Sequence, residues 1–211
     1  MTNIFRKALM AIGFVGALEA GAGDSFINIQ PSQNTRQQNS ALRVEGGKNV
    51  NDNLSLYGFA DLDAAKEGDV DVENIFLKGR VDYNVKGPLG LAADYTGGNN
   101  LDDRVRAGIT LTPKTWKGNF TQFTLFPYDS ETDNGTQAVV FGSQKLGKRV
   151  IASVLADYDL ESKGFYLEPN VDVKLTDKVS AFAQGRAFGD VGEYKGALKD
   201  MATYVGFKID F

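Results

Sequence analysis

The sequence predicts an all-β fold: a transmembrane, antiparallel, up-and-down β-barrel of twelve strands, with ten strands as the alternative. Three observations predict it. Apolar and polar side chains alternate in segment after segment, which gives a strand one apolar and one polar face. Short and long connections also alternate along the chain, as they do between the two ends of a membrane barrel. An export signal comes first, and no later segment has the roughly 20 apolar residues of a membrane-spanning helix.

The first element is a Sec-type signal peptide over residues 1–22. Arg6 and Lys7 precede an apolar run over 8–18, and the small residues of 20–22 follow it as a cleavage pattern. Gly23 is the expected first residue of the mature chain. The predicted organisation is therefore a signal peptide at 1–22 and a single outer-membrane barrel domain at 23–211.

Patterns of period two, bounded by Gly, Pro, Asn and Asp, predict the strands that follow. The twelve expected strands are 25–30, 39–46, 53–63, 75–85, 88–97, 104–113, 118–128, 136–145, 148–159, 165–175, 178–188 and 201–211. Strands 118–128 and 136–145 carry apolar residues on both faces, so the pattern assigns them no register. The first strand is short and precedes the polar stretch 31–38, which keeps the ten-stranded barrel open.

The connections between these strands alternate in length. Tight turns are expected at 86–88, 146–148 and 176–178, where Gly, Pro or Asp supplies the backbone conformation. Longer polar loops are expected at 64–72, 98–102, 129–135 and 189–200. With an even number of strands and a periplasmic C-terminus, the tight turns and both termini would be periplasmic and the polar loops would lie outside.

The last strand, 201–211, ends the chain on an aromatic residue. Its apolar face carries Val205, Phe207, Ile209 and Phe211, and Lys208 lies on the opposite face. This ending resembles the C-terminal assembly signal of bacterial outer-membrane β-barrels. The resemblance implies the barrel-assembly machinery as a partner during biogenesis, and outer-membrane lipid and lipopolysaccharide as the surroundings of the mature protein.

Composition excludes several functions. The chain has no histidine and no cysteine, so it lacks the usual general base, thiolate chemistry and the commonest ligands of transition metals. We therefore expect no enzyme, no cofactor and no metal site. The net charge of −4 argues against nucleic acid as a partner. The acidic loop 129–135 is not a calcium-binding EF-hand, since Val140 occupies the position of the bidentate glutamate; it is a solvated loop or a weak cation contact with lipopolysaccharide.

The polar strand faces place many charges in the lumen. The expected lumen cations are Arg43, Lys78, Arg80, Arg104, Arg106, Arg149, Arg186 and Lys208. The expected lumen carboxylates are Glu45, Asp61, Asp82, Asp94, Asp157, Glu168 and Asp172. Arginines can line a path for carboxylated or phosphorylated solutes. Opposite charges from neighbouring strands can equally pair across a narrow barrel and close it.

In size, strand number and lumen charge the chain resembles the small monomeric twelve-stranded porins for acidic oligosaccharides, such as the oligogalacturonate and sialic-acid channels. The resemblance rests on no sequence motif, so it assigns no ligand residue. It implies a channel for small polar solutes, with a preference for anions as a hypothesis in which Arg80, Arg104, Arg106 and Arg186 set the field. The alternative is a non-conducting structural or surface-contact barrel whose lumen is closed by ion pairs. Nothing in the chain predicts an oligomeric state.

Overall fold

The computed structural model describes residues 25–35, 40–64, 72–99, 102–114, 119–131, 135–161, 163–190 and 200–211. The predicted signal peptide at 1–22 lies outside these residues. Within them, no helix is long and apolar enough to cross a membrane.

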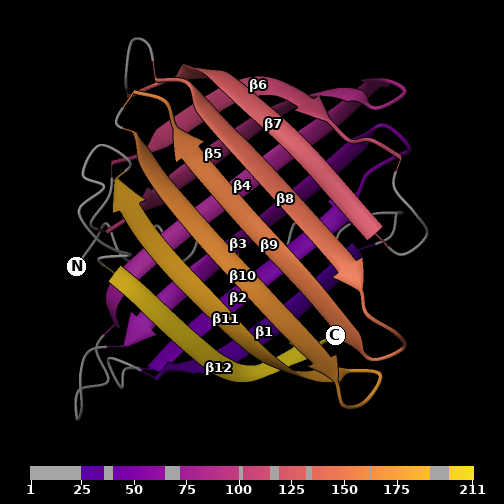
Figure 1. The fold of residues 1–211 in the computed structure, drawn as a ribbon, viewed down its shortest axis with the longest axis vertical. Helices are drawn as coiled ribbons and strands as arrows, with labels where there is room; N and C mark the ends of the chain where they lie inside the picture. Colours follow the sequence, from indigo (N-terminus) through magenta and orange to yellow (C-terminus); the bar gives the residue numbers. More distant parts are fainter. Residues whose placement is uncertain are drawn as a thin grey trace.

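Twelve antiparallel strands make up the fold and run obliquely around one barrel (Figure 1). They are β1 (Ser25–Asn34), β2 (Ser40–Asn49), β3 (Leu54–Ala64), β4 (Val72–Lys86), β5 (Leu89–Gly98), β6 (Arg104–Leu111), β7 (Asn119–Asp129), β8 (Gln137–Lys145), β9 (Val150–Asp159), β10 (Gly164–Lys174), β11 (Val179–Asp190) and β12 (Asp200–Asp210). Each predicted strand therefore corresponds to one observed strand.

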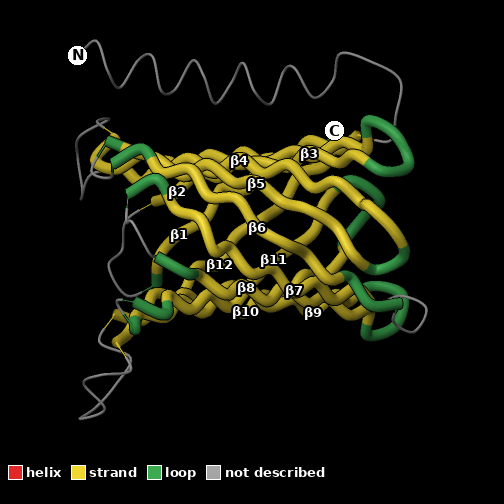
Figure 2. The backbone as a smooth tube through the Cα atoms, turned by 90° about the horizontal axis from the view of Figure 1, so that it is seen from above, coloured by secondary structure: helices red, strands yellow, loops and turns green. Residues whose placement is uncertain are grey.

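Each strand pairs with its sequence neighbours, and β1 pairs with β12 to close the barrel. The closing ladder places Asn28 opposite Asp210 and Asn34 opposite Tyr204. β1 is longer than the predicted 25–30 because its pairing continues through Pro31 to Asn34. Since β1 bonds to both β2 and β12, the twelve-stranded prediction is confirmed and the ten-stranded alternative is wrong. Figure 2 shows the strands arranged as one tube.

The two ends of the tube differ. We call the end that holds the connections after β2, β4, β6, β8 and β10 the turn end, and the opposite end the loop end. The backbone N–H of Phe211 donates to the carbonyl of Ile27 at 3.1 Å, so both termini of the barrel lie at the turn end. Gly87 (φ 60°) and Gly147 (φ 91°) adopt the left-handed conformation that their tight turns require. The predicted tight turns lie together at this end, but the alternation of short and long connections is not strict. Residues 112–118 join β6 to β7 at the turn end, and only residues 160–163 join β9 to β10 at the loop end.

The barrel is apolar outside and polar inside. Leu91, Leu125 and Phe207 point outward and are about half exposed. Asp94 and Arg106 point inward and are each 3% exposed. This distribution is the reverse of that in a soluble protein, and it is the arrangement of barrels that face lipid.

The structure also assigns the register of the two strands whose pattern was ambiguous. Phe126 of β7 and Val139 of β8 point inward, whereas Leu125 of β7 points outward. β7 and β8 therefore carry apolar residues on both faces: the outward ones belong to the outer surface, and the inward ones fill part of the lumen. A β-bulge in β7 places Phe126 and Pro127 opposite the single residue Gly108 of β6.

Candidate functional site: the barrel lumen

A cluster of four charges connects, through the interior, two parts of the barrel wall that are not neighbours. Arg43 of β2 makes two hydrogen bonds to Asp61 of β3, at 2.6 and 2.8 Å. Arg186 of β11 contacts the same Asp61 at 3.0 Å, and both arginines lie 3.4 Å from Glu168 of β10. The hydroxyl of Tyr166 also donates to Glu168. We call Arg43, Asp61, Glu168 and Arg186 the cross-lumen cluster.

A second group of charges surrounds an inward aromatic ring. Arg106 of β6 pairs with Asp94 of β5 at 2.9 Å, and Arg80 of β4 pairs with Asp82 two residues along the same strand at 2.8 Å. The guanidinium groups of Arg80 and Arg106 lie 5.7 and 5.5 Å from the ring centre of Phe126. These are cation–π distances, so Phe126 holds both arginines against the wall of β6 and β7.

The other predicted cations with partners are Arg104 and Lys208. Arg104, at the loop end of β6, pairs with Asp129 and lies 3.5 Å from Asp159. Lys208 of β12 lies 3.3 Å from Glu45 of β2, a carboxylate that also accepts from Asn28 and Tyr57. Each of these cations thus lies against at least one carboxylate.

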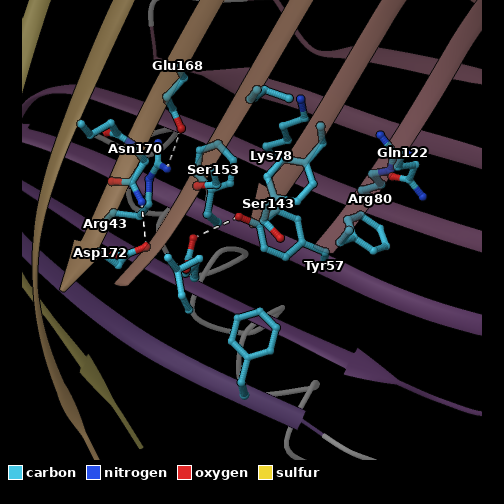
Figure 3. A pocket seen from close by; sticks show the side chains of 18 of the residues that line it. Arg43, Tyr57, Lys78, Arg80, Gln122, Ser143, Ser153, Glu168, Asn170 and Asp172 are labelled. Carbon is cyan, nitrogen blue, oxygen red and sulfur yellow. Dashed lines mark hydrogen bonds and ion pairs between the residues drawn. The ribbon is translucent and has the colours of Figure 1, made fainter. Parts of the chain in front are cut away.

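A cavity of about 500 Å³ remains inside the barrel, lined mainly by the halves of the strands nearer the turn end (Figure 3). Its charged and polar lining includes Gln30, Arg43, Glu45, Lys78, Arg80, Asp82, Gln122, Glu168, Asn170, Asp172 and Lys208. This volume lies in the range of sites that bind small molecules. In each strand every second residue faces inward, so residues from different strands meet in this cavity.

The structure places all the predicted lumen residues except one on inward strand faces. The correction concerns Arg149, which was expected within a strand 148–159. β9 begins at Val150, so Arg149 belongs to the turn after β8, is exposed and does not line the cavity. The reason is local: the backbone N–H of Leu146 donates to the carbonyl of Val150 at 2.8 Å, so Arg149 lies in the connection between the strands, together with Gly147 in its left-handed conformation. Asp172 lines the cavity and accepts a hydrogen bond from Asn170 at 2.8 Å.

Aromatic residues also point into the lumen, and the strand pattern places only Phe76, Tyr166 and Tyr204 of them on polar faces. The whole inward set is Phe26, Tyr57, Phe59, Phe76, Phe120, Phe126, Phe141, Tyr166, Phe182, Phe188 and Tyr204. Phe26, Tyr57, Phe59 and Phe76 form a chain of ring contacts with centres 6.4, 6.2 and 5.7 Å apart. A signal was present in β3, where Tyr57 and Phe59 share the parity of Asp61 and therefore its face.

Comparison with known proteins supports the fold. No protein-family model matches the chain, and no curated protein matches it in sequence. Among solved structures, the KdgM porin superposes with a TM-score of 0.59 at 8% identity, covering 89% of this chain and 99% of the porin. The KdgM porin in complex with disordered oligogalacturonate gives 0.58 at 9% identity with the same coverage. The translocator domain of the autotransporter NalP from Neisseria meningitidis gives 0.48 at 12% identity, covering 97% of this chain and 95% of that domain. The chain therefore resembles the KdgM porin in fold, as a small closed β-barrel.

Proposed function

We propose that this protein is an outer-membrane channel for the diffusion of small polar solutes. The observation that carries the proposal is a polar lumen inside an apolar wall, with a cavity of about 500 Å³ left between the side chains. A closed barrel of this kind can face lipid on the outside and water on the inside. The fold shared with a porin supports the same function.

We further propose that the channel is narrow and discriminates only weakly by charge. The four arginines expected to attract anions, Arg80, Arg104, Arg106 and Arg186, each pair with a carboxylate. A paired arginine contributes a small net field to the pore, since the carboxylate cancels most of its charge at a distance. The preference for anions is therefore weaker than the number of arginines in the lumen would suggest.

Single-channel conductance of the purified protein in a planar bilayer tests this function. Discrete conductance steps with a reversal potential near zero in a salt gradient are expected. Arg106→Gln should shift the permeability ratio toward cations, and Asp94→Asn should shift it toward anions, because each exposes the other member of the pair. Lys145→Gln is the matched control, as Lys145 lies at the rim of the barrel and does not line the cavity.

The second candidate function is a non-conducting barrel with a structural role. The cross-lumen cluster favours it, because its ion pairs connect β2 and β3 with β10 and β11 through the interior. If the protein gives no conductance steps in the bilayer, although the same sample migrates as a folded, heat-modifiable barrel, this alternative is supported and the channel is rejected.

The location and orientation are also part of the proposal. We infer that the signal peptide directs export, that the turn end is periplasmic and that the loop end contacts lipopolysaccharide. Val205 and Phe207 are exposed on the outer face of β12, and Phe211 is exposed directly after it. We propose that the barrel-assembly machinery binds these residues.

The chain has no cysteine, so single introduced cysteines report the orientation directly. In intact cells, a membrane-impermeant maleimide should label Ser130→Cys at the loop end and spare Lys148→Cys at the turn end. The reverse labelling would refute the orientation.

A further inference from the structure

Lys78 is the exception among the cations of the lumen cavity. Four cations line the cavity, and Arg43, Arg80 and Lys208 each pair with a carboxylate. Among the described residues, Lys78 forms neither a hydrogen bond nor an ion pair. The charged groups that act on it electrostatically are Asp94, which pairs with Arg106, and Asp157, together with Arg106 and Arg80 themselves. Lys78 lines the cavity (Figure 3) and is therefore the one cation of its lining, among the described residues, without a direct partner.

Aromatic rings line two sides of the same cavity. Phe26 and Tyr57, from β1 and β3, contact each other with ring centres 6.4 Å apart. Phe120 and Phe141, from β7 and β8, contact each other at 5.9 Å. In a closed barrel of twelve strands, β1 and β3 lie across the lumen from β7 and β8. The cavity therefore has aromatic surfaces on opposite walls.

The charged groups of the cavity other than Lys78 are mostly occupied by one another, whereas Asn170 Oδ1 has no hydrogen-bond partner within the described part of the chain. Glu45 accepts from Asn28 and Tyr57, and Asp82 accepts two hydrogen bonds from Arg80. A ligand with many hydroxyl groups would have to break these contacts, at the cost of leaving buried polar atoms unpaired. A flat apolar ligand with one negatively charged group would leave these contacts intact.

We propose that the cavity binds a small aromatic carboxylate, with its ring between the Phe26–Tyr57 and Phe120–Phe141 surfaces and its carboxylate on Lys78. Ring contacts with aromatic side chains favour offset or edge-to-face packing, which both walls can offer. A carboxylate next to an ammonium in a partly desolvated space forms a strong, charge-assisted hydrogen bond. The site lies in the lumen of the proposed channel and is reached through it, but binding does not require conduction.

Calorimetric titration of the protein in detergent micelles with benzoate tests the site. Wild-type protein should bind benzoate at least ten times more tightly than benzyl alcohol, acetate or glucose. Lys78→Met should weaken benzoate binding about ten-fold and leave benzyl alcohol unaffected, whereas Lys78→Arg should retain most of the affinity. Phe141→Leu, which removes the ring but keeps an apolar side chain, should weaken both aromatic ligands.

Lys145→Met is the matched control, since this lysine shares the inward parity of β8 but lies outside the cavity. Each variant is first checked for heat-modifiable migration as a folded barrel. Equal binding of benzoate and acetate, tighter binding of glucose, or unchanged benzoate affinity in folded Lys78→Met would overturn the proposal. Benzoate binding in a protein without ion currents would reject the channel and keep the site; currents without benzoate binding would do the reverse.

Discussion

Arg186 and Asp61 meet across the lumen, with Nη2 and Oδ2 3.0 Å apart. They belong to β11 and β3, and β12, β1 and β2 separate these strands along the wall. Their side chains are 14% and 7% exposed, so the pair is largely desolvated. The contact ties two distant parts of the wall together and occupies the space between them.

The first prediction follows from this contact. Arg186→Met should destabilise the barrel by about 3 kcal/mol, because it leaves Asp61 and Glu168 with one arginine between them. It should also raise the unitary conductance, since the connection across the lumen is lost. Urea unfolding in detergent and single-channel recording measure the two effects. In the Asp61→Asn/Arg186→Met double variant the losses should be less than additive. Additive losses would show that the two residues do not interact.

The second prediction is that the side chain of Phe126 narrows the lumen. It is fully buried, with Arg80 and Arg106 against its ring. Phe126→Ala should cost about 3–5 kcal/mol through the cavity it creates, and should increase conductance because the two arginines lose their support. Phe123→Ala is the matched control on β7, since Phe123 faces outward and is 44% exposed. Equal conductance in the two variants would contradict a constriction at Phe126.

The third prediction concerns the close approach of β6 to the bulge in β7. A Cβ at Gly108 would lie 2.8 Å from the carbonyl carbon of Leu125 and 2.8 Å from the Cα of Phe126, both of them backbone atoms. Gly108→Ala should therefore lower stability by about 1–3 kcal/mol or more, since the backbone must move to relieve the overlap. At Gly142 the nearest atom would be 3.8 Å away, so Gly142→Ala serves as the control. The midpoint of thermal unfolding, followed by electrophoretic mobility, should fall only for Gly108→Ala.

The fourth prediction tests whether the outer face meets lipid. Leu125 points outward from the middle of β7, whereas Leu175 follows the end of β10 at the turn end. Leu125→Arg should cost about 2–4 kcal/mol if it lies near the middle of the bilayer, and Leu175→Arg about 0–1 kcal/mol near the interface. Both leucines are about half exposed, so a soluble barrel would tolerate the two substitutions equally. Refolding into lipid vesicles followed by urea titration distinguishes these outcomes.

Which residues face the lumen could be predicted from the sequence for some strands and not for others. Phe165 and Val171 of β10 could be assigned to the outer face because polar residues separate them regularly. The same reasoning failed for β7, where Phe123 and Phe126 have opposite parity relative to the wall and both are aromatic. Only the bulge and the pairing with β8 decide that Phe126 points inward. Aromatic side chains are favourable on either face of a narrow barrel, so composition does not distinguish the two faces.

By itself, the sequence determined the class of fold, the places of the strands and of the tight turns, and the faces of the regular strands; the pairing of β1 with β12 decided between ten and twelve strands. These properties depend on local contrasts between neighbouring residues: a period of two and the turn preferences of residues such as Gly87 and Gly147. The tertiary structure decided which lumen charges pair. Arg43 and Glu168 are 125 positions apart, and they meet only because the closed sheet fixes the distance across its interior. No local pattern encodes that distance, so the neutralised arginines and the unpaired Lys78 emerge only in the folded barrel.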